Sequence, residues 1–277
     1  MRKLAMTLFC FAVLSSTAFA QDDHNDSAPL VSGYAVVTTT AGAGQAGNAG
    51  GLVAFESLGW RINSPAIQAS VLPATLTTRM VFFSTANARL SLNTGVGICN
   101  PGATDATVTM VLRNAAGAQT STNTVTVPAR QQAAKYVSEL FAGVSALPPD
   151  FDGTLTVTSN LPVGVVAFRF TNSTFTTIPV ASLSASVPLP LLTPSIGGSD
   201  GVLLPQFASN GFWATEIVVL NNGTQPITVR IDLFNHDGSP MVATLNHQAA
   251  SSFANVVVAA GGTAILAPRN ASGDSDF

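Results

Sequence analysis

The sequence predicts an all-β protein made of two β-sandwiches, and three observations carry that prediction. A strand–turn–strand pattern is written twice, near residues 97–117 and again near 218–238. Short alternating runs of apolar and polar residues are separated by turn residues at the ~8–12-residue spacing typical of sandwiches. The chain is 47% hydrophobic and only 9% charged, which fits a packed β-rich protein and not a disordered one.

The repeat extends to individual residues. Seven positions of the first copy (Asn100, Gly102, Thr107, Val108, Leu112, Asn114, Gly117) recur in the second as Asn221, Gly223, Thr228, Val229, Leu233, Asn235 and Gly238. Self-similarity at a constant separation indicates a duplicated structural unit. The internal repeat is therefore the basis for expecting two sandwiches.

Residues 1–20 have the pattern of a secretory signal peptide. Arg2 and Lys3 precede an apolar run at 4–14, and Ala18 and Ala20 form a small-x-small cleavage site. The apolar run is shorter than the ~20 residues that a spanning helix needs. We expect a secreted protein, extracellular or periplasmic, with no stable membrane span after cleavage.

Charge and cysteine content narrow the possible partners. Loss of Arg2 and Lys3 leaves nine basic residues (11 less 2) against 14 acidic ones, spread thinly. Nucleic acid is not expected as a partner, because it requires a clustered basic face. Cys99 would be the one cysteine left, so no intramolecular disulfide could form. Its apolar neighbours favour a small buried side chain over a catalytic thiol.

The expected domain boundaries follow the composition. Residues 21–32 are a polar leader, and 33–71 are a hairpin followed by a further strand. The first sandwich spans 72–183, a Pro- and Gly-rich linker spans 184–200, the second sandwich spans 201–267, and 268–277 form a polar, loose tail. One short helix, from Tyr136 to Phe141, interrupts the strands of the first sandwich.

The first hairpin, 33–56, has a counterpart in the first sandwich. The segments 153–157 and 164–169 repeat its pattern around a turn at Asn160-Leu161-Pro162. The second sandwich ends before an equivalent hairpin is reached, which would expose a sheet edge. We therefore expect residues 33–56, as part of the segment 33–71, to complete the second sandwich, in the same chain or in a neighbouring one by strand addition.

These features resemble the tandem immunoglobulin-like modules of bacterial secreted proteins. The residues that carry the resemblance are 97–102 (GICNPG), the helix from Tyr136, 151–157 (FDGTLTV) and 204–208 (LPQFA). The resemblance implies two immunoglobulin-like β-sandwich domains and an exported protein. It implies no catalytic residues, because such modules mostly lack an assigned activity.

Several short motifs suggest chemistry, but each has a simpler interpretation. Residues 42–47 match G-x-G-x-x-G, yet a strand follows them where a phosphate-binding loop needs a helix. Asp150 and Asp152 resemble part of a calcium loop, but the remaining ligand positions are missing, and a tight turn into the next strand is expected instead. His236, Asp237 and Ser239 are too close in sequence to converge as a catalytic triad. No cofactor, metal site or enzyme activity is expected.

Trp60 and Trp213 are the candidate ligand-contacting residues. Each follows a glycine-containing loop, and exposed aromatic rings on loops can stack on sugar faces. The alternative is that both rings cover the core.

The expected function is a structural or adhesive exported protein that acts through surface contacts, with strand exchange between copies as a means of assembly. The alternative is a module that binds carbohydrate or a cell-surface polymer. The partner is unknown; the protein itself or such a polymer are the candidates.

If residues 33–56 complete the second sandwich, deletion of residues 21–60 should destabilise that sandwich and spare the first. Chemical denaturation followed by proteolysis of the two halves would report each separately. Unchanged unfolding of both halves would contradict the expectation.

Overall fold

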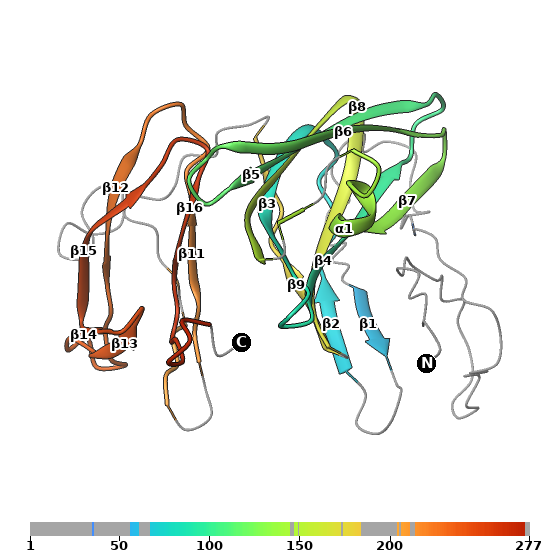
Figure 1. Cartoon of the computed structure of the whole chain (residues 1–277). Helices are drawn as coiled ribbons and strands as arrows, with labels where there is room; N and C mark the ends of the chain where they lie inside the picture. The colour runs from blue at the N-terminus through green and yellow to red at the C-terminus, as the bar shows by residue number, and fades with distance from the viewer. Residues whose placement is uncertain are drawn as a thin grey trace, which may run out of the picture. The chain divides into compact units, whose positions relative to one another are not determined.

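The computed structural model describes residues 35, 56–60, 67–144, 147–148, 150–172, 174–183, 204, 206–210 and 214–274. These residues form an all-β protein with one short helix, and the strand pairings are antiparallel (Figure 1). In order, the strands before the helix are β1 Glu56–Trp60, β2 Ile67–Val71, β3 Thr77–Asn87, β4 Leu92–Asn100, β5 Ala106–Asn114, β6 Gln119–Val127 and β7 Gln131–Tyr136. After helix α1 Val137–Leu140 come β8 Asp150–Thr171, β9 Thr174–Ile178, β10 Ala181–Ser182, β11 Ile217–Leu220, β12 Ile227–Asp232, β13 Ala243–Leu245, β14 Gln248–Ala250, β15 Ser252–Val258 and β16 Thr263–Leu266.

The described residues divide into two compact units. The first holds the residues up to Val111 together with 121–151 and 156–184. The second holds 112–120, 152–155 and the residues from 185 onward. The second unit thus includes the turn between β5 and β6 and residues 152–155 of β8.

An 8-stranded sheet forms the first unit, in the order β10-β3-β4-β8-β5-β6, with β7 added beside β4 and β9 beside β8. Its central strand β4 pairs β7 through residues 95–100 and β8 through residues 92–99. Both faces of β3 are covered, because consecutive residues from Met80 to Ala86 are buried. Such a run does not alternate, since neither face of the strand meets water.

Strand β8 is one continuous strand of 22 residues, so the expected hairpin around Asn160-Leu161-Pro162 is wrong. Inward-facing side chains stay in phase across the supposed turn, with Val157, Ser159 and Val163 all buried. The Asn160 Oδ1 atom accepts a hydrogen bond from the Thr107 amide at 2.8 Å. Pairing with neighbouring strands therefore overrides a local turn signal, as tertiary context often does for β segments.

The matching hairpin expected at 33–56 lies outside the described residues, apart from Ala35 and Glu56. The closure of the second sandwich by that hairpin therefore stays a prediction. The later part of the segment 33–71 is described. Strand β1 pairs β2 in register from Glu56 opposite Val71 to Trp60 opposite Ile67, and β2 packs with the first unit. The proposed deletion of residues 21–60 also removes β1, whereas a deletion of residues 21–55 would leave the hairpin of β1 and β2 intact.

Aromatic rings hold β2 onto β8 within the first unit. Ala69 of β2 is buried against Phe168 and Phe170 of β8. The Phe168 and Phe175 rings meet edge to face with centroids 5.9 Å apart, and Tyr136 meets Phe170 in the same way at 5.2 Å. Edge-to-face aromatic pairs add about 0.5–1.5 kcal/mol beyond the area they bury.

Helix α1 confirms the expected short helix. Its backbone begins after Tyr136, whose amide donates to the Glu139 carboxylate at 2.8 Å and so receives a local cap. Val137, Leu140 and Phe141 are buried. The Asn123 side-chain amide donates to the Leu140 carbonyl and ties the end of the helix to β6.

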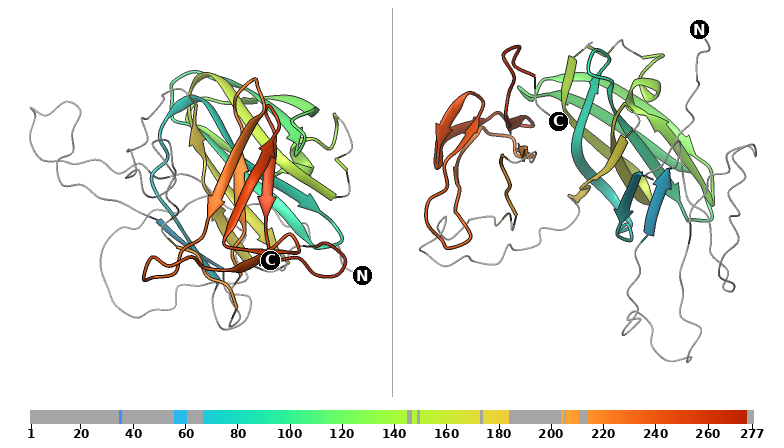
Figure 2. Two further views of the ribbon diagram at one scale, coloured as in Figure 1. Left: turned by 90° about the vertical axis from the view of Figure 1, so that its left-hand side faces the viewer. Right: turned by 90° about the horizontal axis from the view of Figure 1, so that it is seen from below.

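The second unit contains two-stranded ribbons, β11 with β16, β12 with β15 and β13 with β14 (Figures 1 and 2). Side chains from all three ribbons form one core, made of Ile217, Leu233, Ala243, Leu245, Phe253 and Leu266. A β-bulge near Asn255, which has a positive φ of 58°, shifts the register between Val229 and Ile231. One extra residue keeps Phe253 and Val258 buried on the same side of β15.

The described end of the chain is held by hydrogen bonds, in contrast to the loose tail expected. The Asn246 side chain donates to the Ile265 carbonyl at 2.7 Å and accepts from the Ala267 amide at 3.2 Å. Arg269 donates to the same Asn246 oxygen at 3.1 Å and to the Gly273 carbonyl at 3.2 Å. Asn246 and His247, both at positive φ, make the turn between β13 and β14 that presents this side chain.

Asn100 and Asn221, which the repeat aligns, make equivalent hydrogen bonds. The Asn100 side chain donates to the carbonyls of Thr104 at 2.8 Å and Val127 at 3.0 Å, and its oxygen accepts from the Gly102 amide at 3.0 Å. Both asparagines are buried. Asn221 donates to Gln225 and Val258 at 2.8 and 3.1 Å and accepts from Gly223 at 2.8 Å.

A second pair of aligned residues makes equivalent turns. The Gly117 amide donates to the Asn114 carbonyl at 2.8 Å, and the Gly238 amide donates to the Asn235 carbonyl at 2.9 Å. Both glycines have positive φ, 81° and 83°. A side chain is disfavoured in that region of backbone space, which is why glycine recurs at this place.

Replacement of Asn100 or Asn221 by Ala should lower the free energy of unfolding by about 1–3 kcal/mol, because buried carbonyls lose their donor. Denaturant unfolding of N100A and N221A measures this. Asn222→Ala is the matched control, since Asn222 is exposed and adjacent, and it should change stability by less than about 0.5 kcal/mol. Equal stability of all three variants would contradict a structural role for the two amides.

Candidate interaction surface

Several large apolar side chains of the second unit are exposed. Val257 on β15 is 65% exposed and Val242, just before β13, is 67% exposed. Ile227 at the start of β12 and Phe234 beyond its end are also exposed large hydrophobics. Ile227 pairs with the buried Val258, so Ile227 and the adjacent Val257 expose opposite faces of the β12–β15 ribbon.

The ribbon of β12 and β15 also has strand edges that no described strand covers. Each of the two strands pairs only with the other among the described residues. The N–H and C=O groups of such an edge are able to bind a further strand. An edge strand in a small two-layer unit is therefore both a weakness and a means of association.

Two features of this ribbon limit uncontrolled pairing. Arg230 on β12 forms an ion pair with Asp232, with Nη2 and Oδ1 2.9 Å apart, so charge lies on the strand. The bulge at Asn255 twists β15 locally. Charges and bulges are common protections of natural sheet edges, and they restrict pairing to strands that fit.

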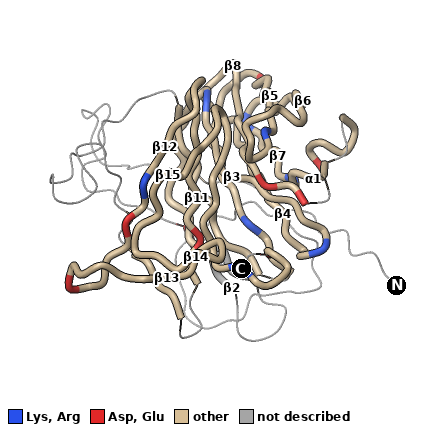
Figure 3. The backbone as a smooth tube through the Cα atoms, turned by 60° about the vertical axis from the view of Figure 1, so that its left-hand side comes forward, with Lys and Arg blue, Asp and Glu red and all other residues tan. Residues whose placement is uncertain are grey.

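Elsewhere, charged residues are sparse. Figure 3 shows isolated Lys, Arg, Asp and Glu positions along the described backbone and no gathering of one sign. The described residues hold no group of three or more His, Cys, Asp or Glu that could bind a metal ion. Within the described part of the chain, no helix is long and apolar enough to cross a membrane.

The described structure does not test the two tryptophans that the sequence singled out. The Trp60 backbone belongs to β1, opposite Ile67, but its side chain and all of Trp213 lie outside the described residues. The glycine-rich motif at 42–47 also lies outside them. A role in ligand stacking for the two tryptophans therefore stays a prediction.

Asp150 and Asp152 lie inside the first residues of β8, not in a turn before the strand as expected. Both are exposed. Successive residues of a strand point to opposite faces, so the side chains of Asp150 and Asp152, which are two residues apart, lie on the same face. Two carboxylates on a flat strand supply far fewer than the six to eight oxygens that calcium prefers.

The His236-to-Ser239 segment is a turn. The Asp237 carboxylate accepts hydrogen bonds from the Ser239 hydroxyl at 2.6 Å and from the Ser239 amide at 2.9 Å. These bonds, the hydroxyl first, lower the pKa of Asp237. The serine hydroxyl donates directly to the carboxylate, so its proton is not directed at a histidine as a triad requires.

Glu56 and Cys99 are the described groups with the largest pKa changes. Desolvation raises the pKa of Glu56 from 4.5 to about 7, so near neutral pH this carboxyl is partly protonated. Desolvation also raises the pKa of the Cys99 thiol from 9.0 to about 11. Cys99 is only partly buried, not fully buried as expected, and a thiol held protonated at neutral pH is a poor nucleophile.

Sequence reasoning missed the exposed apolar residues of β12 and β15. The sequence did hold a signal. A strand with one face in water should alternate apolar and polar residues, so the apolar run Val256-Val257-Val258 places at least one valine on the face in water. The bulge at Asn255 changes which of these valines faces inward. That change depends on the partner strand and is not encoded in the run itself.

Comparison with known proteins places few limits on function. No family model matches the chain, and no curated protein matches it. Among solved structures, the chain is similar to the Anabaena sensory rhodopsin transducer, with 22% sequence identity and a TM-score of 0.30, over 34% of this chain and 98% of that one. A likeness of this size carries no argument about function.

Because the folded state holds the Cys99 proton more tightly, alkylation by iodoacetamide at pH 8 should be much slower in the native protein than in denaturant. Between pH 9 and about 11 the unfolded thiol ionises first, so the free energy of unfolding should fall as pH rises. Mass spectrometry measures the alkylation and denaturant titration measures the stability. Cys99→Ser is the control and should lose this part of the pH dependence; equal alkylation rates in both states would contradict partial burial of the thiol.

Proposed function

We propose that this is an exported, non-catalytic protein with a structural or adhesive role outside the cell. In this proposal it consists of two immunoglobulin-like β-sandwich units that derive from one repeated unit. The equivalent hydrogen bonds of Asn100 and Asn221 support the repeat, since an aligned buried amide satisfies aligned backbone carbonyls in both units. The immunoglobulin-like assignment rests on the residue resemblance and on the antiparallel sheets.

The observation that carries the proposed function is the uncovered ribbon of β12 and β15. Ile231 of β12 and Val256 of β15 are only partly buried against the core of the second unit, and Val229 of β12 is also only partly buried. Ile227 is 40% exposed although its partner Val258 is fully buried. A layer with one more strand would cover these side chains, because strand neighbours on the same face shield one another.

An added strand would bind through two sets of contacts. Its backbone would pair with the free edge of the ribbon, and its inward side chains would extend the apolar layer beside Ile227 and Val229. The strand is supplied either by the same chain, from residues 33–56, or by a neighbouring copy. Repetition of the second arrangement gives open chains of subunits, as expected of a heterologous contact that does not close.

A charge on this ribbon should prevent assembly between copies. In Val257→Lys, a lysine on an edge strand would oppose edge-to-edge pairing. Size-exclusion chromatography with light scattering, across a wide concentration range, should show concentration-dependent oligomers of the mature wild-type chain and none of V257K.

Val144→Lys is the matched control. Val144 follows α1 in the first unit and is 52% exposed, against 65% for Val257, so it receives the same charge in a similar setting. The oligomers of V144K should persist. A wild-type protein that stays monomeric at every concentration, or a V257K variant that still assembles, would contradict assembly through this ribbon.

A further inference from the structure

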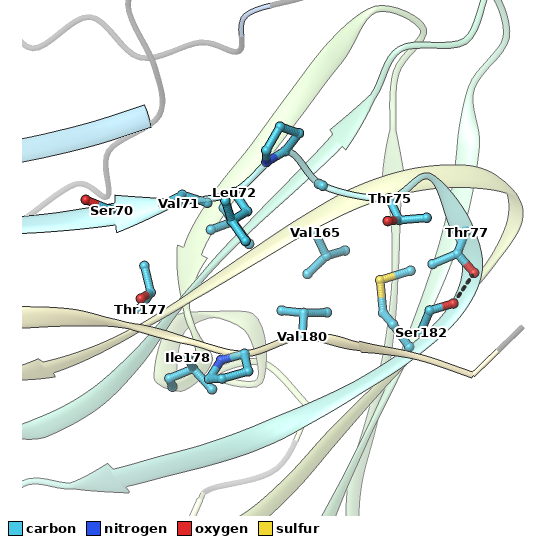
Figure 4. A pocket seen from close by; sticks show the side chains of 15 residues that line it. Ser70, Val71, Leu72, Thr75, Thr77, Val165, Thr177, Ile178, Val180 and Ser182 are labelled. Carbon is cyan, nitrogen blue, oxygen red and sulfur yellow. Dashed lines mark hydrogen bonds between the residues drawn. The ribbon is translucent and has the colours of Figure 1, made fainter. Parts of the chain in front are cut away.

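A cavity of about 480 Å³ lies in the first unit, between the segment that follows β2 and the segment that joins β9 to β10 (Figure 4). Its floor comes from β3 and β8, where Met80 is 1% exposed and Val165 is 6% exposed. Leu72, at the edge, is 77% exposed. The cavity therefore has a buried apolar floor and an open, apolar rim. Its size is within the ~300–1,000 Å³ range of small-molecule sites.

The walls of the cavity are held in place by the sheet. Strand β10 pairs β3 through Ala181 opposite Val81 and Ser182 opposite Met80. On the other side, the segment after β2 lies directly on β8, because a Cβ at Gly164 would be 3.4 Å from the Ala74 side chain. This segment therefore packs on β8 at van der Waals distance. Both walls are thus attached to the 8-stranded sheet independently of any ligand.

The lining determines the chemistry of the ligand. Among the described residues that form it, none is charged and none is aromatic; they are aliphatic, proline, methionine or hydroxyl residues. An ionised ligand would lose its hydration without gaining a partner. A sugar would find no ring to stack on. The lining therefore favours an uncharged and mainly apolar molecule.

Hydroxyl groups provide a polar end. Figure 4 shows Thr77 and Ser182 side by side at one end of the cavity, and their hydroxyl oxygens are 3.2 Å apart and hydrogen-bonded. The Thr77 hydroxyl also has the Arg79 carbonyl as an acceptor at 3.4 Å. The apolar side chains of Val165 and Val180 lie between this end and Thr177. A few polar groups against an apolar lining are typical of sites that orient a small molecule.

Two prolines argue against a peptide strand as the occupant. Pro73 lies in one wall just after β2, and Pro179 lies in the other just after β9. Proline has no backbone N–H and cannot donate to an added strand. A peptide placed between the two walls would lack a ladder bond on each side, so addition of a strand is disfavoured here.

We propose that this cavity binds an uncharged, mainly apolar small molecule, with its polar end toward Thr77 and Ser182. The proposal is independent of the adhesive function, because every residue that forms the site lies in the first unit and outside the β12–β15 ribbon. Either can fail without the other.

Fluorescence titration of the full mature chain with N-phenyl-1-naphthylamine, an uncharged apolar probe, tests the proposal. Saturable binding at one site per chain is expected. In Val180→Phe the larger side chain fills the cavity, and in Val180→Asp a charge enters it; both should weaken binding at least about tenfold, which corresponds to 1.4 kcal/mol. Val257→Phe places the same ring on an exposed residue of the second unit and should bind as the wild type does.

Circular dichroism and thermal unfolding establish that each variant is folded. Since Val180 lies beyond the end of β9 and is only partly buried, V180F should fold. Three results would overturn the proposal: no saturable binding to the wild type, unchanged binding in both Val180 variants, or equal loss in Val257→Phe. Tighter binding of the sulfonated probe 1-anilinonaphthalene-8-sulfonate than of the neutral one would also overturn the assigned ligand chemistry.

Discussion

The backbone hydrogen bonds along strand edges are the constraint on which this structure depends. Each strand presents a row of N–H and C=O groups that must find partners or remain in water. In the first unit, the 22-residue strand β8 pairs with β4, β5 and β9 and so joins most of the sheet. In the second unit, the described strands form two-stranded ribbons, and each strand pairs with one described strand only. The two units thus handle the same constraint differently.

In the loops, the buried asparagines satisfy the same requirement, because their side chains form hydrogen bonds with backbone groups that no strand pairs. Where β4 or β11 ends and the chain turns, backbone carbonyls would be left without donors inside the protein. Asn100 and Asn221 supply those donors from a side chain and also accept from the glycine two residues later. An aspartate could not replace them, because its ionised oxygens accept only. This explains why an amide, and not merely a polar residue, recurs at the same place in the repeat.

The exposed ribbon and the cavity represent two ways in which a β protein with few charges can bind. In the proposed assembly, the ribbon contributes backbone groups and a partly covered apolar layer to an added strand. The cavity offers side chains on a rigid floor, and prolines disfavour a strand there. Low charge suits both, since neither needs to attract an ion.

The sequence by itself determined the all-β class and the short helix. The all-β class follows from local alternation and from turn residues. The sequence also singled out Asn100 and Asn221 through the repeat. It did not reveal β7, whose residues 131–136 lack strong apolar alternation and form a strand because they pair with β4. Only the tertiary structure decided that β8 is continuous, that the bulge at Asn255 leaves Val257 outward, and that residues 70–77 and 177–182 enclose a cavity. Each of these depends on which strands become neighbours, and a local pattern carries no information about a partner that is distant along the chain.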